Sequence, residues 1–184
     1  MTLPNVSADV LARGGVKIIS SLRPSSFEEG WYDIATAEHF WLHWRMKALR
    51  AALRDAGLPL DHKLRALDIG GGRGILRAQL ERESKWAVDM ADLDASALQS
   101  RVPSRGRTFY YDIADRDPAL VAAYDAVFVF DVLEHVAPTR EFLAASLDHV
   151  KPGGFLFLNV PALSSCYSAF DGAGAMPGDY YPAP

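Results

Sequence analysis

The chain has 184 residues, of which 49% are hydrophobic and 23% charged, so it can bury one substantial core and is most simply one domain. Its net charge of -4 argues against a general nucleic-acid binder, because such proteins usually present a basic face. The single cysteine, Cys166, cannot form an internal disulfide, and no apolar run resembles a signal peptide or a membrane span. We therefore expect a cytoplasmic protein that binds no nucleic acid.

The N-terminal part of the chain divides into two segments. Residues 1–35 lack clear periodicity and are interrupted by prolines and glycines, so we expect an arm or lid rather than core. From Thr36 the pattern becomes helical and stops at Gly57. The apolar stripe of this helix consists of Leu42, Met46, Leu49 and Leu53.

A glycine-rich stretch follows the first predicted strand, residues 64–69, and precedes a predicted helix over 75–83. Glycines at 70, 72 and 74 give the spacing G-x-G-x-G, whereas the dinucleotide fingerprint would need a glycine where the chain has Ile75. The mismatch disfavours NAD and FAD. The glycines would let the backbone turn tightly, so that a ligand could lie on the main chain near free N–H donors.

Strands and helices alternate through the rest of the chain. The patterns predict strands over 86–92, 107–111, 125–130 and 155–160, and helices over 96–101, 117–124 and 139–150. This alternation is typical of a Rossmann-like, doubly wound α/β fold with a mainly parallel sheet, here of five strands. The strand 125–130 is nearly all apolar, as expected for a central strand covered on both faces.

Four acids lie at the ends of successive predicted strands: Asp68, Asp92, Asp112 and Asp131. In such a sheet, ligands bind beyond the carboxyl ends of the strands. A carboxylate after the second strand can accept both hydroxyls of a ribose, and one after the third can accept the exocyclic amine of adenine. The pattern therefore indicates an adenosine site, although Asp89 or Asp94 could replace Asp92 because the strand end is uncertain by a few residues.

Four segments in order resemble the class I S-adenosylmethionine-dependent methyltransferases, in the branch with Leu-Glu-His after the fourth strand. They span roughly residues 36–162 and read LDIGGGRG (67–74), DLD (92–94, with Leu98 following), YDAVFVFDVLEHV (124–136) and LDHVKPGG (147–154).

The resemblance implies S-adenosyl-L-methionine as cofactor. It implies that Asp68 and the glycine loop hold the methionine end, Asp92 the ribose, and Asp112 with Ile113 the adenine. The cofactor-binding residues expected on this basis are Asp68, Gly70, Gly71, Gly72, Gly74, Asp92, Leu93, Asp112, Ile113 and Asp131.

Methyl transfer from a sulfonium is an in-line displacement, so the protein mainly aligns donor and acceptor and excludes water. If the acceptor is a hydroxyl or an amine, a general base helps, and His135 is the best candidate by position and by its ordinary pKa. The Glu134-His135 pair could instead stabilise the following turn. Asp131, Glu134 and His135 could also converge on a divalent metal, but the chain offers no clear fourth ligand, and we expect no metal.

The C-terminal residues depart from the family. Residues 163–184 form an irregular tail in which 172–184 have no strand or helix period, so we expect truncation or a changed reading frame near residue 171. The family's last two strands would then be missing. A sheet without them would expose an edge, which a homodimer could cover.

These observations support methyl transfer to a small-molecule acceptor. A cofactor-binding module without turnover is the alternative, because the C-terminal part of the family's fold is absent. An NAD-dependent oxidoreductase would fit the fold but not the glycine spacing.

Overall fold

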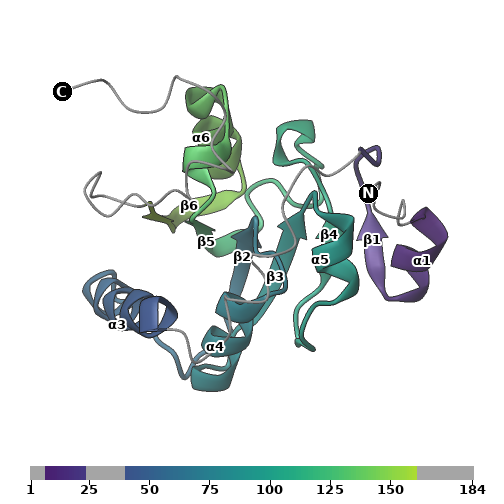
Figure 1. The fold of residues 1–184 in the computed structure, drawn as a ribbon. Coiled ribbons are helices and arrows are strands. Elements are labelled where there is room, and N and C mark those ends of the chain that lie inside the picture. The colour runs from purple at the N-terminus through teal and green to yellow at the C-terminus, as the bar shows by residue number, and fades with distance from the viewer. Residues whose placement is uncertain (1–6, 24–39, 161–184) are drawn as a thin grey trace.

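In a computed structural model of the chain, residues 7–23 and 40–160 are described, and they form a parallel sheet with helices on both faces (Figure 1). The six strands are β1 (Val16–Ile18), β2 (Arg65–Ile69), β3 (Ala87–Asp92), β4 (Thr108–Tyr110), β5 (Tyr124–Phe130) and β6 (Val150–Asn159). The α-helices are α1 (Ala8–Arg13), α3 (Phe40–Asp55), α4 (Ile75–Glu83), α5 (Ala95–Gln99) and α6 (Thr139–Asp148), and the 3-10 turns are η1 (Ile113–Asp115) and η2 (Leu133–His135).

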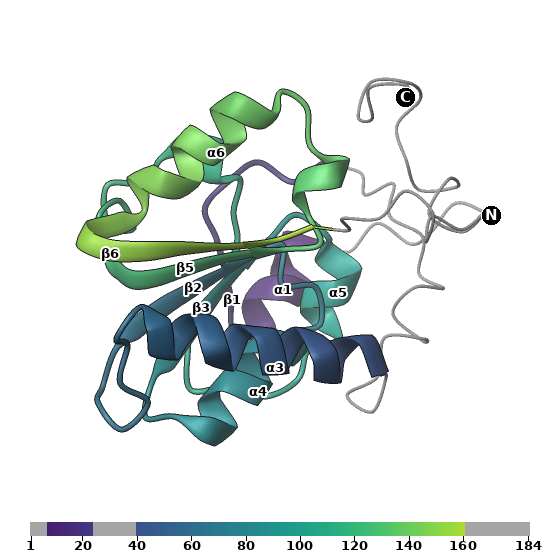
Figure 2. The ribbon, with the colours of Figure 1, turned by 90° about the vertical axis from the view of Figure 1, so that its left-hand side faces the viewer.

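Alternating side chains along the strands build a core on each face of the sheet. In β2, Ala66 packs with Leu49, Leu80 and Trp86 beneath α3 and α4, while Leu67 packs with other residues on the face covered by α6. Figure 2 shows α3 and α4 on one side of the sheet and α6 on the other. The doubly wound α/β fold is therefore confirmed. Within the two described ranges, no helix is long and apolar enough to cross a membrane.

The sixth strand lies where the sequence patterns predicted an arm or lid. β1 pairs in parallel with β4, with Val16 opposite Thr108, and extends the sheet at that edge (Figure 1). Val16 and Leu11 of α1 are 3% and 1% exposed and join a small core with β3, β4 and α5. The prediction of five strands, with no core contribution from residues 1–35, was therefore wrong for the described part of this segment. β1 has only three residues and follows two glycines, so its sequence shows no periodic pattern of apolar residues.

Two further element predictions need correction. Residues 118–122 form turns rather than the helix predicted over 117–124, and Tyr124 already begins β5. Ala122 has a positive φ of 49°, and its N–H donates to the carbonyl of Asp148. The backbone at Ala122 therefore leaves the helical conformation before a helix can form. β6 begins at Val150 rather than at 155, because the glycine-containing stretch is absorbed as a register shift opposite Tyr124 and Ala126.

The strand order β1-β4-β3-β2-β5-β6 positions the site. From β2 the chain continues to β3 and β4 on one side and then crosses to β5 and β6 on the other. Order reverses between β2 and β5, and in parallel α/β sheets ligands bind beyond the carboxyl ends of the strands at such a point. The residues that follow β2, β3 and β5 therefore lie close together at the carboxyl end of the sheet.

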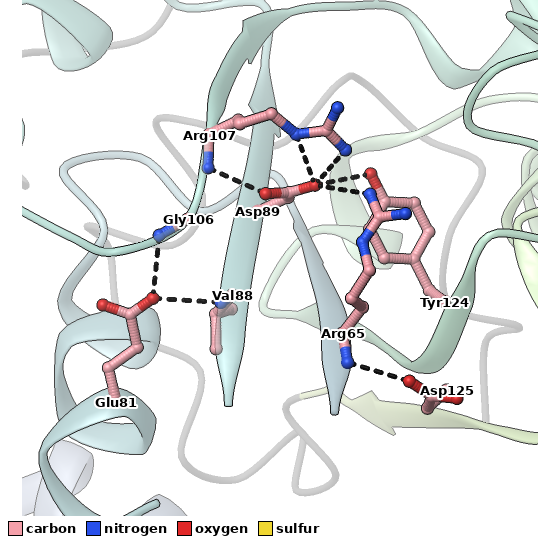
Figure 3. Close-up of polar contacts among 8 residues, drawn as sticks. All are labelled: Arg65, Glu81, Val88, Asp89, Gly106, Arg107, Tyr124 and Asp125. Carbon is pink, nitrogen blue, oxygen red and sulfur yellow. Dashed lines mark hydrogen bonds and ion pairs between the residues drawn. The ribbon is translucent and has the colours of Figure 1, made fainter. Parts of the chain in front are cut away.

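The opposite end of the strands carries a polar cluster around the buried Asp89 of β3 (Figure 3). The Asp89 carboxylate accepts hydrogen bonds from the side chains of Arg107 (2.6 Å), Tyr124 (3.0 Å) and Arg65 (3.2 Å). Burial acts to raise the pKa of Asp89, but the hydrogen bonds and charge of Arg107 bring it below its ordinary value. This cluster joins the amino ends of β2, β4 and β5, away from the carboxyl-end site.

Candidate cofactor site

The loop after β2 adopts the backbone that its glycines predict. Gly70, Gly72 and Gly74 have φ values of 70°, 55° and 80°, in the left-handed region that other residues rarely adopt. A Cβ at Gly70 would collide with the side chain of Val132, and one at Gly71 would lie 2.6 Å from Asp68 Oδ2. The loop therefore forms a bare backbone cradle directly above Asp68.

Asp68 lies within β2 and is 2% exposed. Its Oδ2 accepts no hydrogen bond from the described residues. Burial raises the pKa of Asp68 to about 7, although the positive charges of Arg45 and Arg77 act against this rise. A buried carboxyl oxygen without a donor is costly, so this atom is suited to receive a donor from a ligand.

Asp92 ends β3 and connects this strand to the glycine loop. Its Oδ2 accepts from the N–H of Gly72 at 2.7 Å, and its Oδ1 accepts from the N–H of Asp94 at 2.7 Å. Burial raises its pKa, and these backbone N–H groups act against the rise. Each oxygen keeps a further lone pair, so the carboxylate can still accept the two hydroxyls of a ribose.

The two alternative ribose acceptors, Asp89 and Asp94, have other roles in the fold. Asp94 caps α5 by accepting from the N–H groups of Ser96 and Ala97, and Asp89 belongs to the cluster at the other end of the sheet. Leu93, also expected at the cofactor, is partly buried against the small core that contains Met90 and Leu98.

Asp112 follows β4 and begins η1, where its Oδ1 accepts from the N–H of Ala114 at 3.0 Å. Its Oδ2 forms an ion pair with Arg23 at 3.2 Å. Ile113, the other residue expected at the adenine, is 2% exposed and packs in the core on the α6 face of the sheet. Arg23 is a site residue that the sequence patterns did not indicate.

Asp131 follows β5 in a strained conformation, with a positive φ of 56°. Its two oxygens are held by Arg45 of α3 (2.7 Å) and by the side-chain amide of Asn159 at the end of β6 (2.5 Å). The Arg45 side chain is 10% exposed, and its Nε has no hydrogen-bond acceptor in the described part of the chain. Arg45 is a site residue that the sequence patterns missed, because a basic residue on an amphipathic helix normally faces solvent.

His135 lies in η2, on the chain that leaves β5, and is exposed. The metal hypothesis would bring it together with Asp131 and Glu134. In residues 7–23 and 40–160, no three His, Cys, Asp or Glu side chains are grouped so as to hold a metal ion, and the Asp131 carboxylate is taken by Arg45 and Asn159.

These residues fit the small adenosyl amino acid that the sequence pattern indicated. The oxygen of Asp68 can accept from an ammonium group, the glycine loop packs its backbone directly against Asp68, and Asp92 can accept from ribose hydroxyls. Since Gly72 donates to Asp92, the loop and the ribose acceptor form one hydrogen-bonded unit.

Residues 41–177 match the protein family described as a methyltransferase domain, so the chain belongs to this family. The match extends beyond residue 162, where we expected the core to end. Two curated relatives are ubiquinone biosynthesis O-methyltransferases: that of Marinobacter nauticus is 32% identical over 136 residues, and that of Burkholderia multivorans 33% over 144 residues. These alignments cover 70% and 73% of this chain but 56% and 59% of the relatives, so the chain spans little more than half of their length.

The fold is similar to that of an amino pentose methyltransferase from Micromonospora echinaspora, solved with S-adenosylmethionine bound. The TM-score is 0.58 at 20% identity, over 82% of this chain and 62% of the other. The similarity supports a Rossmann-like methyltransferase fold.

Proposed function

We propose that the chain binds S-adenosylmethionine and transfers its methyl group to a small-molecule acceptor. The observation that carries this proposal is the buried Asp68 oxygen, which has no donor among residues 7–23 and 40–160, beneath the glycine cradle. An ammonium group on the ligand would satisfy this oxygen, and the methionine end of the cofactor supplies one. Family membership supports the same activity.

Each group of site residues would have a separate task. Asp68 accepts from the ligand ammonium, and Arg45 adds positive charge beside it, where a ligand carboxylate can be balanced. Asp92 holds the ribose, and Asp112 with Ile113 borders the adenine. The bound cofactor supplies a methyl group activated by a sulfonium, and the protein aligns it and excludes water.

We propose an oxygen acceptor on a small molecule, because the curated relatives are named as O-methyltransferases. His135 would then remove the proton of the hydroxyl group, since it is exposed on the segment that follows β5, at the same end of the sheet as Asp131.

The first test is calorimetric titration of the purified chain with S-adenosylhomocysteine, with NADH as the control ligand. We expect micromolar binding of the first and none of the second. A folded chain that binds neither would contradict the proposal. Binding without methyl transfer to any of a panel of small-molecule hydroxyl acceptors would instead favour a cofactor-binding module without turnover.

Replacement of His135 by Ala tests the proposed base. We expect S-adenosylhomocysteine affinity to be unchanged and the rate of transfer to fall by about 10²- to 10⁴-fold, the usual contribution of a general base. Single-turnover rates measured across pH would check this. An unaltered rate with the same pH dependence would assign His135 to the turn instead.

A further inference from the structure

The strand β1 brings a short N-terminal segment, Ser20 to Arg23, to the carboxyl end of β4. The N–H groups of Ile19 and Ser20 both donate to the carbonyl of Tyr110, at 3.0 and 3.3 Å, so the segment continues the pairing of β1 with β4. The N–H of Arg23 donates to Tyr110 Oη at 2.9 Å. We refer to residues 20–23 as the β1 extension.

The β1 extension is fixed to the residues around the expected adenine position. Ser20 is 4% exposed; its hydroxyl accepts from the N–H of Asp112 at 2.8 Å and donates to Asp115 Oδ2 at 2.5 Å. Arg23 contributes its guanidinium to Asp112 Oδ2. Both ends of the β1 extension therefore contact the turn that begins at Asp112.

Both oxygens of the Asp112 carboxylate thus have a partner. Oδ1 accepts from the N–H of Ala114, and Oδ2 pairs with the guanidinium of Arg23. The Asp112 side chain is 21% exposed and that of Arg23 is 60% exposed, so a ligand can reach the pair from solvent. An amine that approaches Oδ2 would meet the positive charge of Arg23, because a guanidinium can only donate.

We propose that Arg23 determines how the site reads position 6 of the purine. The inference rests on the proposed function, in which Asp112 borders the adenine. With Arg23 in place, the pair presents a donor and an acceptor side by side, so it tolerates either an amino group or an oxygen acceptor at position 6 of the purine. Without Arg23, the carboxylate alone would favour the 6-amino group, and the ion pair would no longer compete with it.

Replacement of Arg23 by Met tests the inference through two ligands that differ only in the substituent at this position. S-adenosylhomocysteine carries the amino group, and its 6-methoxypurine analogue carries an oxygen acceptor there, with N1 unprotonated in both. For Arg23→Met we expect S-adenosylhomocysteine to bind about two- to fivefold more tightly, the range set by an exposed ion pair. The 6-methoxypurine analogue should bind equally or more weakly, so the affinity ratio of the two ligands should rise at least about twofold.

Ionic strength gives a second measure of the same ion pair. Salt screens exposed charges, so wild-type affinity for S-adenosylhomocysteine should increase between low and high salt, and that of Arg23→Met should not. Arg50→Met is a matched control, because Arg50 forms another partly exposed ion pair, with Glu83, between α3 and α4. It should leave both the ligand ratio and the salt dependence as in the wild type.

An unchanged or smaller ligand ratio in Arg23→Met would overturn the inference, provided that the variant unfolds at the wild-type temperature. A ratio that also rises in Arg50→Met would overturn it, since the effect would then not belong to the purine position. Failure of the wild type to bind either ligand would overturn the proposed function itself, and this result is distinct from the other two.

Discussion

The buried carboxylate of Asp68 lowers the stability of the unliganded fold, but it provides an acceptor for a ligand. Its pKa is raised to about 7 by burial, above the ordinary value of 3.8 that it takes in the unfolded chain. A group with a raised pKa favours folding below its unfolded pKa, and this contribution is lost as the pH rises through the folded pKa. The unliganded protein therefore loses stability between about pH 4 and pH 7 through this residue.

Asp68→Asn should remove that loss. We expect the variant to be more stable than the wild type at pH 8, by up to roughly 4 kcal/mol, with an advantage that shrinks as the pH is lowered toward 4. Urea denaturation at several pH values would measure it. The same variant should bind S-adenosylhomocysteine more weakly, because an amide is a poorer acceptor for an ammonium group. A stability difference that is the same at every pH would contradict the assignment.

Asp92 and Asp94 can be separated by paired substitutions. Asp92→Ala should weaken S-adenosylhomocysteine binding by about 1 to 3 kcal/mol, because it removes the ribose acceptor and the partner of the Gly72 N–H. Asp94→Ala should instead lower stability by about 0.5 to 2 kcal/mol through loss of the α5 cap, with little change in affinity. Calorimetry and thermal unfolding of both variants would check this; the reverse result would transfer the ribose role to Asp94.

At the scale of the elements, the cluster links Asp89 of β3 to the amino ends of β2, β4 and β5 (Figure 3). The turn before β4 also packs closely against β3. Glu81 of α4 accepts hydrogen bonds from the N–H groups of Val88 and Gly106, and a Cβ at Gly106 would overlap the backbone of Val88. Glycine is needed here because the bend before β4 lies against the backbone of β3.

Asp89→Asn should destabilise the fold by about 1 to 3 kcal/mol at neutral pH, because the half-exposed Arg107 and the buried Tyr124 would lose their charged acceptor. The pKa of Asp89 is lowered, so its contribution is present above the unfolded pKa near 3.9 and is lost as the pH falls through the folded value. Urea denaturation at pH 7 and at pH 3 would show a difference that shrinks in acid.

Asp148→Asn is the control for this prediction, because Asp148 pairs with Arg116 on the surface, where the side chains are 46% and 45% exposed. It should cost no more than about 1 kcal/mol. Equal losses in the two variants would mean that burial of Asp89 adds nothing to its pairing.

The sequence predicted those elements whose signal is local. The glycine spacing and the apolar runs placed β2, α4 and β5 within a residue or two, because backbone freedom and two-sided burial leave a direct pattern. It did not predict β1, whose three residues become a strand only through pairing with β4. The helix expected after Asp117 was wrong for a similar reason: its start signal is real, but Tyr124 is buried in the sheet, where its hydroxyl donates to Asp89.

The site shows the same division. Asp68 and the glycine loop could be identified from adjacency in the chain. Arg45 and Arg23 could not, because each reaches an acid that lies more than eighty residues away in the sequence. Long-range ion pairs leave no periodic pattern, so only the folded arrangement reveals them.

At the scale of the whole molecule, β6 ends the sheet, and its outer edge pairs with no other strand among residues 7–23 and 40–160. Leu147 of α6 is 54% exposed, and Phe155 and Leu158 of β6 are 37% and 48% exposed. Exposed edges and apolar patches favour association, so we expect the chain to dimerise as its concentration rises.

Leu158→Lys should shift this equilibrium toward the monomer, because a charged side chain beside a strand edge opposes pairing. Sedimentation velocity over a range of concentrations would measure the shift. Val10→Lys is the control, since Val10 is similarly exposed, at 38%, but lies on α1 away from β6. A wild type that stays monomeric at every concentration would contradict the prediction.

The pairing of β1 with β4 also has a consequence for the order in which the protein is made. Val16 lies opposite Thr108, so β1 leaves the ribosome long before its neighbour in the sheet exists. Contacts between residues so distant in sequence form slowly, because a long loop must first be closed. The contacts that Ser20 and Arg23 of the β1 extension make with Asp112 therefore form late in synthesis, after the glycine loop and its strand have formed.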